Sequence, residues 1–128
     1  HVIYKASYDM ATGEFNDVKL LAGSFGVTGY ADGTGTSAKF NEPSQGDVDE
    51  DGNFYVADRG NHCIRVITPD GEVSTYAGQN KAGMVDGIAS LAEFNNPEGC
   101  QFGPDGALYV ADYSNHAIRK VEDRPPQT

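Results

Sequence analysis

The chain contains no tryptophan, only two cysteines and two methionines, and few positive charges. It has no apolar run near the roughly 18 residues that a membrane-spanning helix needs, so we expect no membrane insertion. No basic segment followed by a long apolar one opens the chain at His1, a start that also fits a removed signal or a piece of a longer protein. Cys63 and Cys100 both fall inside expected strands, which favours buried free thiols over a disulfide framework.

Positive charge is scarce, because nine lysines and arginines stand against nineteen aspartates and glutamates, a formal net charge of −10. Such a chain repels phosphate backbones, so we expect no nucleic-acid partner. The 128 residues suffice for one ordinary domain, and the 16 glycines lie at turns rather than in a low-complexity run. This composition predicts an all-β chain with many tight connections.

The stretch 51–78 shows how the chain is organised. Short segments rich in β-forming residues alternate there with turn residues; the segments are 54–57, 63–67 and 73–77, and the turns 51–52, 59–62 and 69–71. Runs of this kind are a hairpin signature.

Much of that stretch recurs 54 residues later. Aligning 29–68 with 83–122 gives 17 identities in 40 positions, and Asp58 falls on Asp112. Two copies of one structural unit are therefore predicted.

Each copy reads as a strand that ends in Ala-Gly, a long glycine-rich loop with a helix-compatible turn, and three more strands. Pro43 or Pro97 opens the second strand, a position where proline loses no interior ladder bond. The predicted units are four-stranded antiparallel meanders at 18–72 and 73–121, the latter without a following outer strand.

The stretch FNEPSQGDVDEDGNFYVADRGNHCIRVITPDGEVSTYAG, at 40–78, resembles an NHL repeat, named for an Asn-His-Leu signature. The signature reads Asn-His-Cys-Ile at 61–64 and Asn-His-Ala-Ile at 115–118, and the resemblance covers about 18–121. It implies blades of a β-propeller, usually six-bladed. The loop sequence GYADGTGTSAKFNEP is most similar to NHL repeats of secreted or surface-attached bacterial proteins, which implies an extracellular, cell-surface or periplasmic location. In the family, the first strand of a blade begins with Pro-x-Gly followed by small apolar residues. The strands expected at 43–48 and 97–102, which follow the Ala-Gly strand of each sequence unit, depart from that pattern.

The chain ends fit an incomplete ring. Residues 1–5 align with 62–66, so 1–17 should hold the last strands of a preceding blade, with a long connecting turn over 6–16. Residues 122–128 are expected to be a tail, because Pro125 and Pro126 would forbid an outer strand. The expected arc of two, four and three strands leaves bare edges, and propellers need about 4 to 8 blades to close. The expected partners are therefore the remaining blades of the same propeller, in a longer chain or in other copies.

Two groups of residues invite a metal reading. Asp47, Asp49 and Asp51 match the opening of a calcium loop, but they sit at a hairpin tip and the second copy keeps only Asp105-Gly106, so solvated turn carboxylates are favoured. His62 and His116 occur at one repeat position after a turn Asn. Zinc-bound histidines occur in peptide-amidating lyases on NHL-like propellers, but recurrence in frame favours a structural role at the turn backbone. We expect no metal site and no cofactor.

Arg65 and Arg119 lie among apolar neighbours in the third strand of each unit. Packing or an ion pair with an acidic residue of the adjacent blade is expected for them, rather than ligand contact.

One face of the expected disk gathers candidate ligand-binding residues. The long loops and the second-to-third strand corners bring Tyr30, Asp32, Arg59 and Tyr113 to this loop face, and the innermost strands add Asp47 and Gln101. No nucleophile motif or phosphate-binding glycine loop accompanies them, so no catalytic residue is assigned. The predicted function is non-catalytic binding of a protein or glycan by a bacterial extracytoplasmic NHL propeller. The alternatives are a propeller enzyme, such as a lyase or hydrolase, with its site completed by other blades, and a structural spacer.

Overall fold

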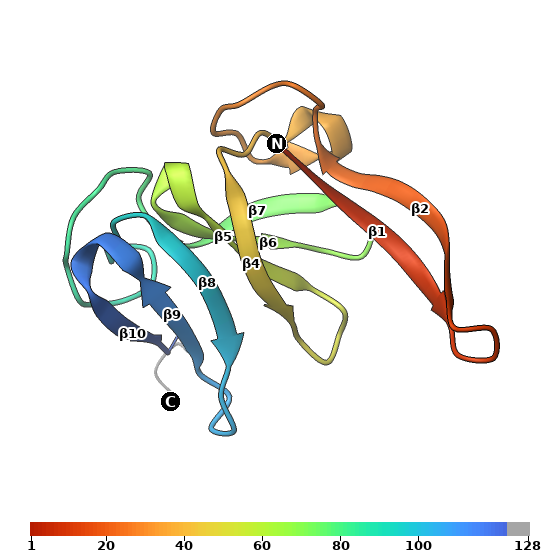
Figure 1. Ribbon diagram of the computed structural model, residues 1–128. Coiled ribbons are helices and arrows are strands. Elements are labelled where there is room, and N and C mark those ends of the chain that lie inside the picture. Colours follow the sequence, from red (N-terminus) through yellow and green to blue (C-terminus); the bar gives the residue numbers. More distant parts are fainter. Residues whose placement is uncertain (123–128) are drawn as a thin grey trace, which may run out of the picture.

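The computed structural model describes residues 1–122, without the side chains of Tyr8 and residues 15–17 (Figure 1). The expected tail at 122–128 therefore lies, from residue 123 on, outside the described residues. The strands are β1 (Val2–Asp9), β2 (Glu14–Gly23), β3 (Gly33–Thr34), β4 (Pro43–Val48), β5 (Phe54–Asp58), β6 (Cys63–Ile67), β7 (Glu72–Gly78), β8 (Pro97–Phe102), β9 (Leu108–Asp112) and β10 (Ala117–Val121). Three one-turn 3-10 helices are η1 (Gly35–Ser37), η2 (Arg59–Asn61) and η3 (Tyr113–Asn115).

The strands form three antiparallel sheets, which confirms the all-β prediction. Their orders are β1-β2, β3-β7-β6-β5-β4 and β10-β9-β8. Apart from the two-residue β3, which the sequence did not reveal, the sheets hold two, four and three strands as expected. Within residues 1–122 the sheets make an open arc and not a closed ring (Figure 1).

The strands that end in Ala-Gly do not begin the sheets of their own sequence units, contrary to the four-stranded meanders predicted at 18–72 and 73–121. β2 pairs with β1, and β7 pairs with β6. The reason is the length of the connections: the turn at 68–71 returns the chain directly onto β6, whereas 19 residues separate β2 from β4. The middle and third sheets therefore begin, in sequence, at Pro43 and Pro97. The division of the sequence into repeats at 18–72 and 73–121 stays a prediction.

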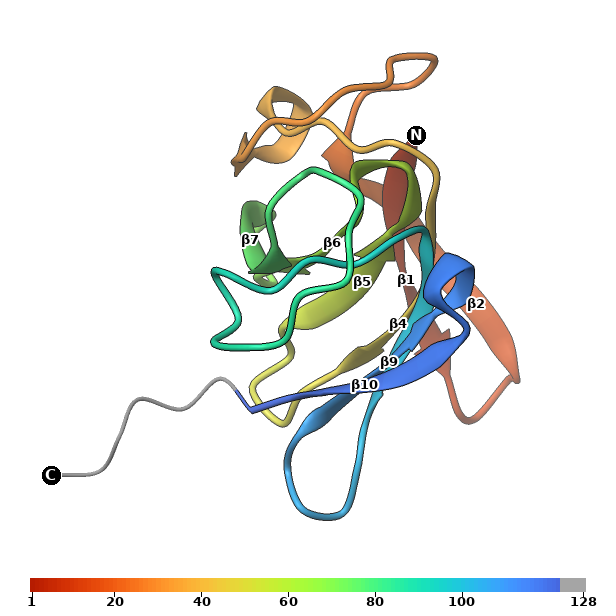
Figure 2. The ribbon, with the colours of Figure 1, turned by 90° about the vertical axis from the view of Figure 1, so that its left-hand side faces the viewer.

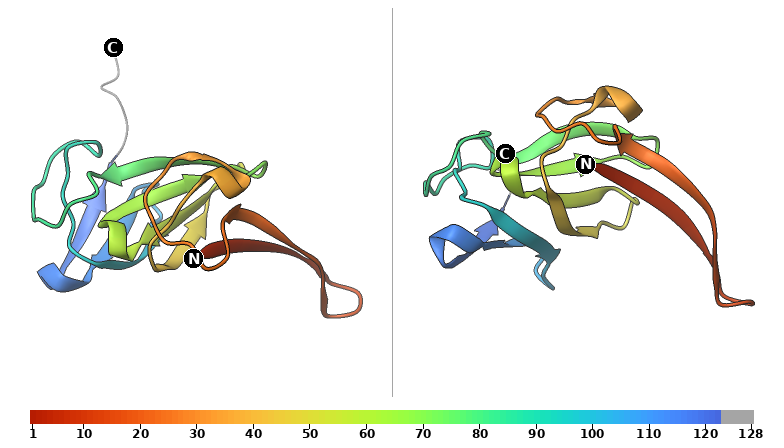
Figure 3. Two further views of the ribbon diagram at one scale, coloured as in Figure 1. Left: turned by 90° about the horizontal axis from the view of Figure 1, so that it is seen from above. Right: turned by 45° about the horizontal axis from the view of Figure 1, so that its top comes forward.

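The first hairpin is longer than its counterpart. The expected turn at 6–16 is mostly strand, because β1 and β2 remain paired up to Asp9 and Glu14. The Gly13 N–H closes the tip on the Asp9 carbonyl at 2.7 Å. This hairpin extends away from the other sheets (Figure 3).

Two apolar layers lie between successive sheets. One layer, built around Phe40, Val56 and Ile67, joins β1-β2 to the middle sheet, and the other, built around Ile64, Phe94 and Leu108, joins the middle sheet to β8–β10. Val56 and its neighbour Ala57 face different layers because successive strand residues point to opposite faces.

No described sheet covers the apolar face at the β10 end of the arc. Ile64 is fully buried against the third sheet, but Ile118, at the same repeat position, is 72% exposed. Ala57 is likewise fully buried, while its equivalent Ala111 is exposed. A further sheet packed on this side would therefore bury the same positions that the third sheet buries in the middle one.

The connections segregate to two sides of the arc. The loop at 24–42 and the corners η2 and η3 lie on one side, and the hairpin tips at 49–53 and 103–107 lie on the other (Figures 1 and 2). We call the first side the loop face. No helix among residues 1–122 is long and apolar enough to cross a membrane.

Candidate functional site

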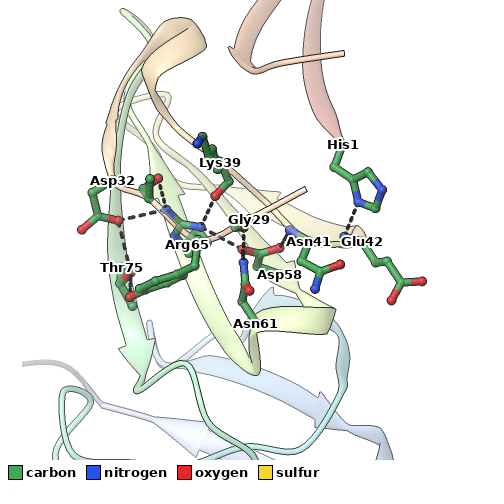
Figure 4. Close-up of polar contacts among 12 residues, drawn as sticks. His1, Gly29, Asp32, Lys39, Asn41, Glu42, Asp58, Asn61, Arg65 and Thr75 are labelled. Carbon is green, nitrogen blue, oxygen red and sulfur yellow. Dashed lines mark hydrogen bonds and ion pairs between the residues drawn. The ribbon is translucent and has the colours of Figure 1, made fainter. Parts of the chain in front are cut away.

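A buried ion pair organises the corner between β5 and β6 (Figure 4). Arg65 Nη1 donates to Asp58 Oδ2 at 2.8 Å, and both side chains are fully buried. The same carboxylate accepts from Asn61 Nδ2 at 2.7 Å, and its other oxygen accepts from the Asn41 N–H at 2.8 Å. Asp58 thus ties the corner to the loop that leads into β4.

Arg65 also closes the base of that loop. Its guanidinium donates to the carbonyls of Lys39 and Ala31 and to Asp32 Oδ1, at 2.8–2.9 Å. The Phe40 ring lies 5.1 Å from the guanidinium carbon. A buried arginine with this many acceptors is a structural cross-link, since each contact offsets part of its desolvation cost.

The second copy repeats this arrangement with the same offset. Arg119 Nη1 donates to Asp112 Oδ2 at 2.7 Å, and Asn115 Nδ2 donates to the same oxygen at 2.7 Å. Arg119 reaches Asp86 at 2.8 Å, as Arg65 reaches Asp32. Recurrence of the whole network shows that it serves the fold of every unit.

The ion pairs predicted for the two arginines are present, but their partners differ from those predicted. Arg65 and Arg119 form ion pairs, but with carboxylates of their own corner and leading loop rather than with the adjacent blade. The cause is the 3-10 turn at η2 and η3, which folds Asp58 and Asp112 back beside the next strand.

Two predicted ligand residues belong to this network. Asp32 accepts from Arg65 and, at 3.3 Å, from the Thr75 hydroxyl, and Tyr30 shares a 2.7 Å hydrogen bond with that hydroxyl. The Tyr30 ring covers Arg65, 4.8 Å from its guanidinium carbon. The second-copy equivalent of Tyr30 is Met84, so this cover is not part of the repeated unit.

Two histidines, His1 and His62, link successive blades, and His62 and His116 turn the chain. His62 and His116 adopt left-handed backbone angles, φ 56° and 53°, at the ends of η2 and η3. We predicted that the His62 ring would hydrogen-bond the backbone of its own turn. Instead, the ring accepts from the Asn96 N–H of the next blade at 3.0 Å. His1 accepts from the Glu42 N–H in the same way, at 2.6 Å. Both rings accept from the residue just before a proline that opens an inner strand, Pro97 or Pro43, although the two separations differ, at 34 and 41 residues.

The inner strands are joined by side chains of β4. Asp47 Oδ2 accepts from the Phe102 N–H at 3.0 Å, and Ser44 Oγ donates to the Glu98 carbonyl at 2.5 Å. These two groups cap backbone atoms of β8 that would otherwise lie bare at its inner edge. Asp47 therefore has a contact between sheets, whereas Gln101, at the equivalent position in β8, is exposed and has no such contact among residues 1–122.

The remaining two predicted residues meet across the loop face. Arg59 opens η2 and Tyr113 opens η3, and the Arg59 guanidinium carbon lies 5.9 Å from the Tyr113 ring centroid. Arg59 Nη2 lies 3.8 Å from Glu98 Oε1, and both side chains are partly exposed. A hollow of about 350 Å³ lies beside Arg59 and Glu98, and Ser44, Gln45, Gly99 and Ala111 complete its lining. The six predicted residues thus do not form one site: Tyr30 contacts the Asp32 network, Arg59 contacts Tyr113, and Asp47 and Gln101 stand apart.

The calcium-like segment is a closed turn. Asp49 accepts from the N–H groups of Asp51 and Asn53, each at 2.9 Å, and from the Tyr55 hydroxyl at 3.1 Å. Burial raises the pKa of Asp49, but the hydrogen bonds from Asn53 and Tyr55 outweigh it and hold that pKa below its usual value. Across residues 1–122, no three His, Cys, Asp or Glu side chains come together as a metal-binding group.

The two thiols are free and buried, as predicted. Burial raises the pKa of Cys63 and of Cys100 to about 12, so neither is a thiolate at neutral pH. Nucleophilic chemistry at either cysteine is therefore disfavoured.

A family model confirms the repeat. The model described as NHL repeat matches residues 40–67 and 94–121, which contain both Asp-Asn-Arg corners. The chain belongs to the NHL repeat family. NHL repeat-containing protein 2 of Bos taurus is 33% identical over 105 residues, which are 81% of this chain but only 14% of that protein.

Solved structures resemble this NHL chain over nearly its whole length. An auxiliary nutrient binding protein from Bacteroides thetaiotaomicron aligns with a TM-score of 0.86 and 31% identity, over 94% of this chain and 32% of that one. A putative phosphatase from the same species aligns with a TM-score of 0.87 and 31% identity, over 99% of this chain and 31% of that one. The chain thus spans about a third of the solved proteins it resembles.

Proposed function

We propose that this chain is a non-catalytic binding module, part of a bacterial extracytoplasmic NHL propeller that binds a protein or glycan on its loop face. The name of the similar nutrient binding protein supports both the binding role and an extracellular or periplasmic location. The sequence already predicted this function, and the structure directs the proposal to the part of the loop face around Arg59 and Tyr113.

The observation that carries the proposal is the contact between Arg59 and Tyr113. These residues occupy the same position in two copies of one repeat, yet they differ in type, while the neighbouring Asp58 and Asp112 are identical. The residues of the corner network are the same in both copies, so the difference at this exposed position favours a role outside that network. An arginine beside an exposed tyrosine at the rim of a hollow is typical of a recognition surface.

The proposal includes further blades that pack against the sheets of this chain. They would cover the apolar face that holds Ile118 and close the ring, either from a longer chain or from other copies. The ligand would then meet a loop face built from several blades, of which this chain supplies the Arg59–Tyr113 portion.

An enzyme is the second candidate, because one similar structure is named a putative phosphatase. Residues 1–122 hold no group of three metal-binding side chains, and the raised pKa values of Cys63 and Cys100 disfavour either thiol as its nucleophile. In this case the reacting groups would come from other blades, and the hollow would only position the substrate.

Binding is tested with immobilised protein against a glycan array and a soluble extract of host or bacterial surface proteins. The double variant Arg59→Ala/Tyr113→Ala should lose most of the signal. The matched control, Lys5→Ala/Met10→Ala on the β1-β2 hairpin, removes one cation and one large exposed side chain away from the loop face and should keep it. Equal loss in both variants, or no ligand at all, would reject the proposal. Turnover of phosphate esters that survives purification and depends on Arg59 would favour the enzyme.

A further inference from the structure

Arg59 differs from the other two arginines of the described residues. Arg65 and Arg119 are almost completely buried, and each is neutralised by two carboxylates within 2.9 Å. Arg59 has a single ion pair, at 3.8 Å to Glu98, and its side chain is 37% exposed. A half-exposed pair at this distance is weak, so the guanidinium keeps donors free for another acceptor.

The surroundings of Arg59 combine three chemistries: Glu98 and Gln45 line the same hollow as Arg59, and the Tyr113 ring contacts Arg59 from outside that lining. The Tyr113 ring is flat and 56% exposed, Glu98 offers acceptors, and Gln45 offers both a donor and an acceptor. A hollow of about 350 Å³ is of the size that takes one or two monosaccharide units, at the small end of ligand pockets.

We propose that this hollow binds a uronic-acid residue of an oligosaccharide, with the sugar carboxylate on Arg59, the apolar face of the ring near Tyr113 and a hydroxyl donating to Glu98. This inference rests on the proposed binding function and names its ligand class. The planar fork of an arginine matches a carboxylate with two parallel hydrogen bonds.

Glu98 separates this ligand from other anions. Its carboxylate lies beside Arg59, so a phosphate group, with its higher charge, would be repelled more strongly than a single carboxylate. A uronic acid presents one negative group flanked by neutral hydroxyl donors. It therefore satisfies Arg59 and Glu98 together.

The experiment is titration calorimetry on the full chain with trimers of galacturonic, glucuronic and mannuronic acid, each beside its methyl ester. Esterification removes the charge and leaves the ring and hydroxyls. We expect at least one acid to bind about tenfold tighter than its ester, equivalent to about 1.4 kcal/mol. Arg59→Gln should abolish that difference, Arg59→Lys should keep part of it, and Lys5→Gln, which removes one exposed cation elsewhere, should keep all of it.

The outcomes separate the two proposals. Equal affinity for acid and ester, or an acid preference that survives Arg59→Gln, would overturn the uronate assignment. Capture of a neutral glycan or an acidic peptide through Tyr113 would also overturn it and would leave the binding function standing. Absence of any glycan or protein ligand for the loop face would reject both.

Discussion

Arg65 and Asp58 form an ion pair at 2.8 Å in which neither side chain touches solvent. Such a pair adds little net stability over an apolar substitute, because desolvation opposes the attraction. Its consequence is geometric: the pair fixes the β5-β6 corner and holds the backbone of the long loop at Lys39 and Ala31. The loop that borders the proposed binding surface is thus anchored by a buried charge.

Removing one partner of this pair should be costly. Asp58→Ala leaves the Arg65 guanidinium buried without its central acceptor, and we expect the free energy of unfolding to fall by about 3–5 kcal/mol. Denaturant unfolding followed by circular dichroism measures the change. Asp86→Ala is the control, since that carboxylate is 87% exposed and should cost less than about 1 kcal/mol. Similar costs in both variants would contradict the role assigned to Asp58.

The His62 ring should hold two blades together. His62→Asn keeps a residue that tolerates the left-handed backbone, so it removes the hydrogen bond to the Asn96 N–H without straining the turn. We expect a loss of about 1–2 kcal/mol and faster amide exchange at Asn96. His116→Asn is the matched control, because the His116 ring has no hydrogen-bond partner among residues 1–122. Unchanged exchange at Asn96 would show that the ring does not link the blades.

The sequence predicted the strands and the corners because their turn chemistry recurs at a fixed offset. Asp58 and Asp112, with the Asn-His pairs that follow, mark each corner in both copies. The turn at 69–71 predicted the hairpin of β6 and β7, but the repeat units assigned 73–77 to the following copy. A repeat has no intrinsic start, and the connection lengths decide which strands share a sheet.

The candidate site could be predicted only in part. Arg59 and Tyr113 stand out as unlike residues at a repeated position, and the structure brings them together. The carboxylates of Asp32 and Asp47 looked equally available in the sequence. Their acceptors are occupied by Arg65 and by the Phe102 N–H, partners 33 and 55 residues away. Side-chain contacts at such separation follow from packing between sheets, which no local pattern encodes.

Asp47 and Gln101, the two inner-strand residues predicted to contact a ligand, should differ in their effect on stability. Asp47→Ala leaves the Phe102 N–H without its acceptor, and we expect a loss of about 1–2 kcal/mol in unfolding free energy. Gln101→Ala should change stability by no more than about 0.5 kcal/mol. If both substitutions left stability unchanged and weakened ligand binding, Asp47 would be a binding residue after all.

Asp105 gives the chain a pH-dependent contact at the β8-β9 tip. The Tyr109 hydroxyl donates to Asp105 Oδ2 at 2.7 Å and, with the Ala107 N–H and Lys120, holds the pKa of Asp105 below its ordinary value of 3.8. A carboxyl whose pKa is lower in the folded than in the unfolded state stabilises the fold above the unfolded value, and this contribution is lost as the pH falls through the folded value. Tyr109→Phe should raise the pKa of Asp105, and its destabilising effect should vanish at pH values below both pKa values.

NMR titration of the Asp105 carboxyl carbon in the wild type and in Tyr109→Phe measures that shift. Tyr55→Phe supplies the comparison, because its hydroxyl donates to Asp49 at 3.1 Å and leaves Asp105 untouched. The Asp105 pKa should rise only in Tyr109→Phe, and the Asp49 pKa only in Tyr55→Phe. If the Asp105 pKa did not change when the Tyr109 hydroxyl is removed, Lys120 and the backbone donor alone would set that pKa.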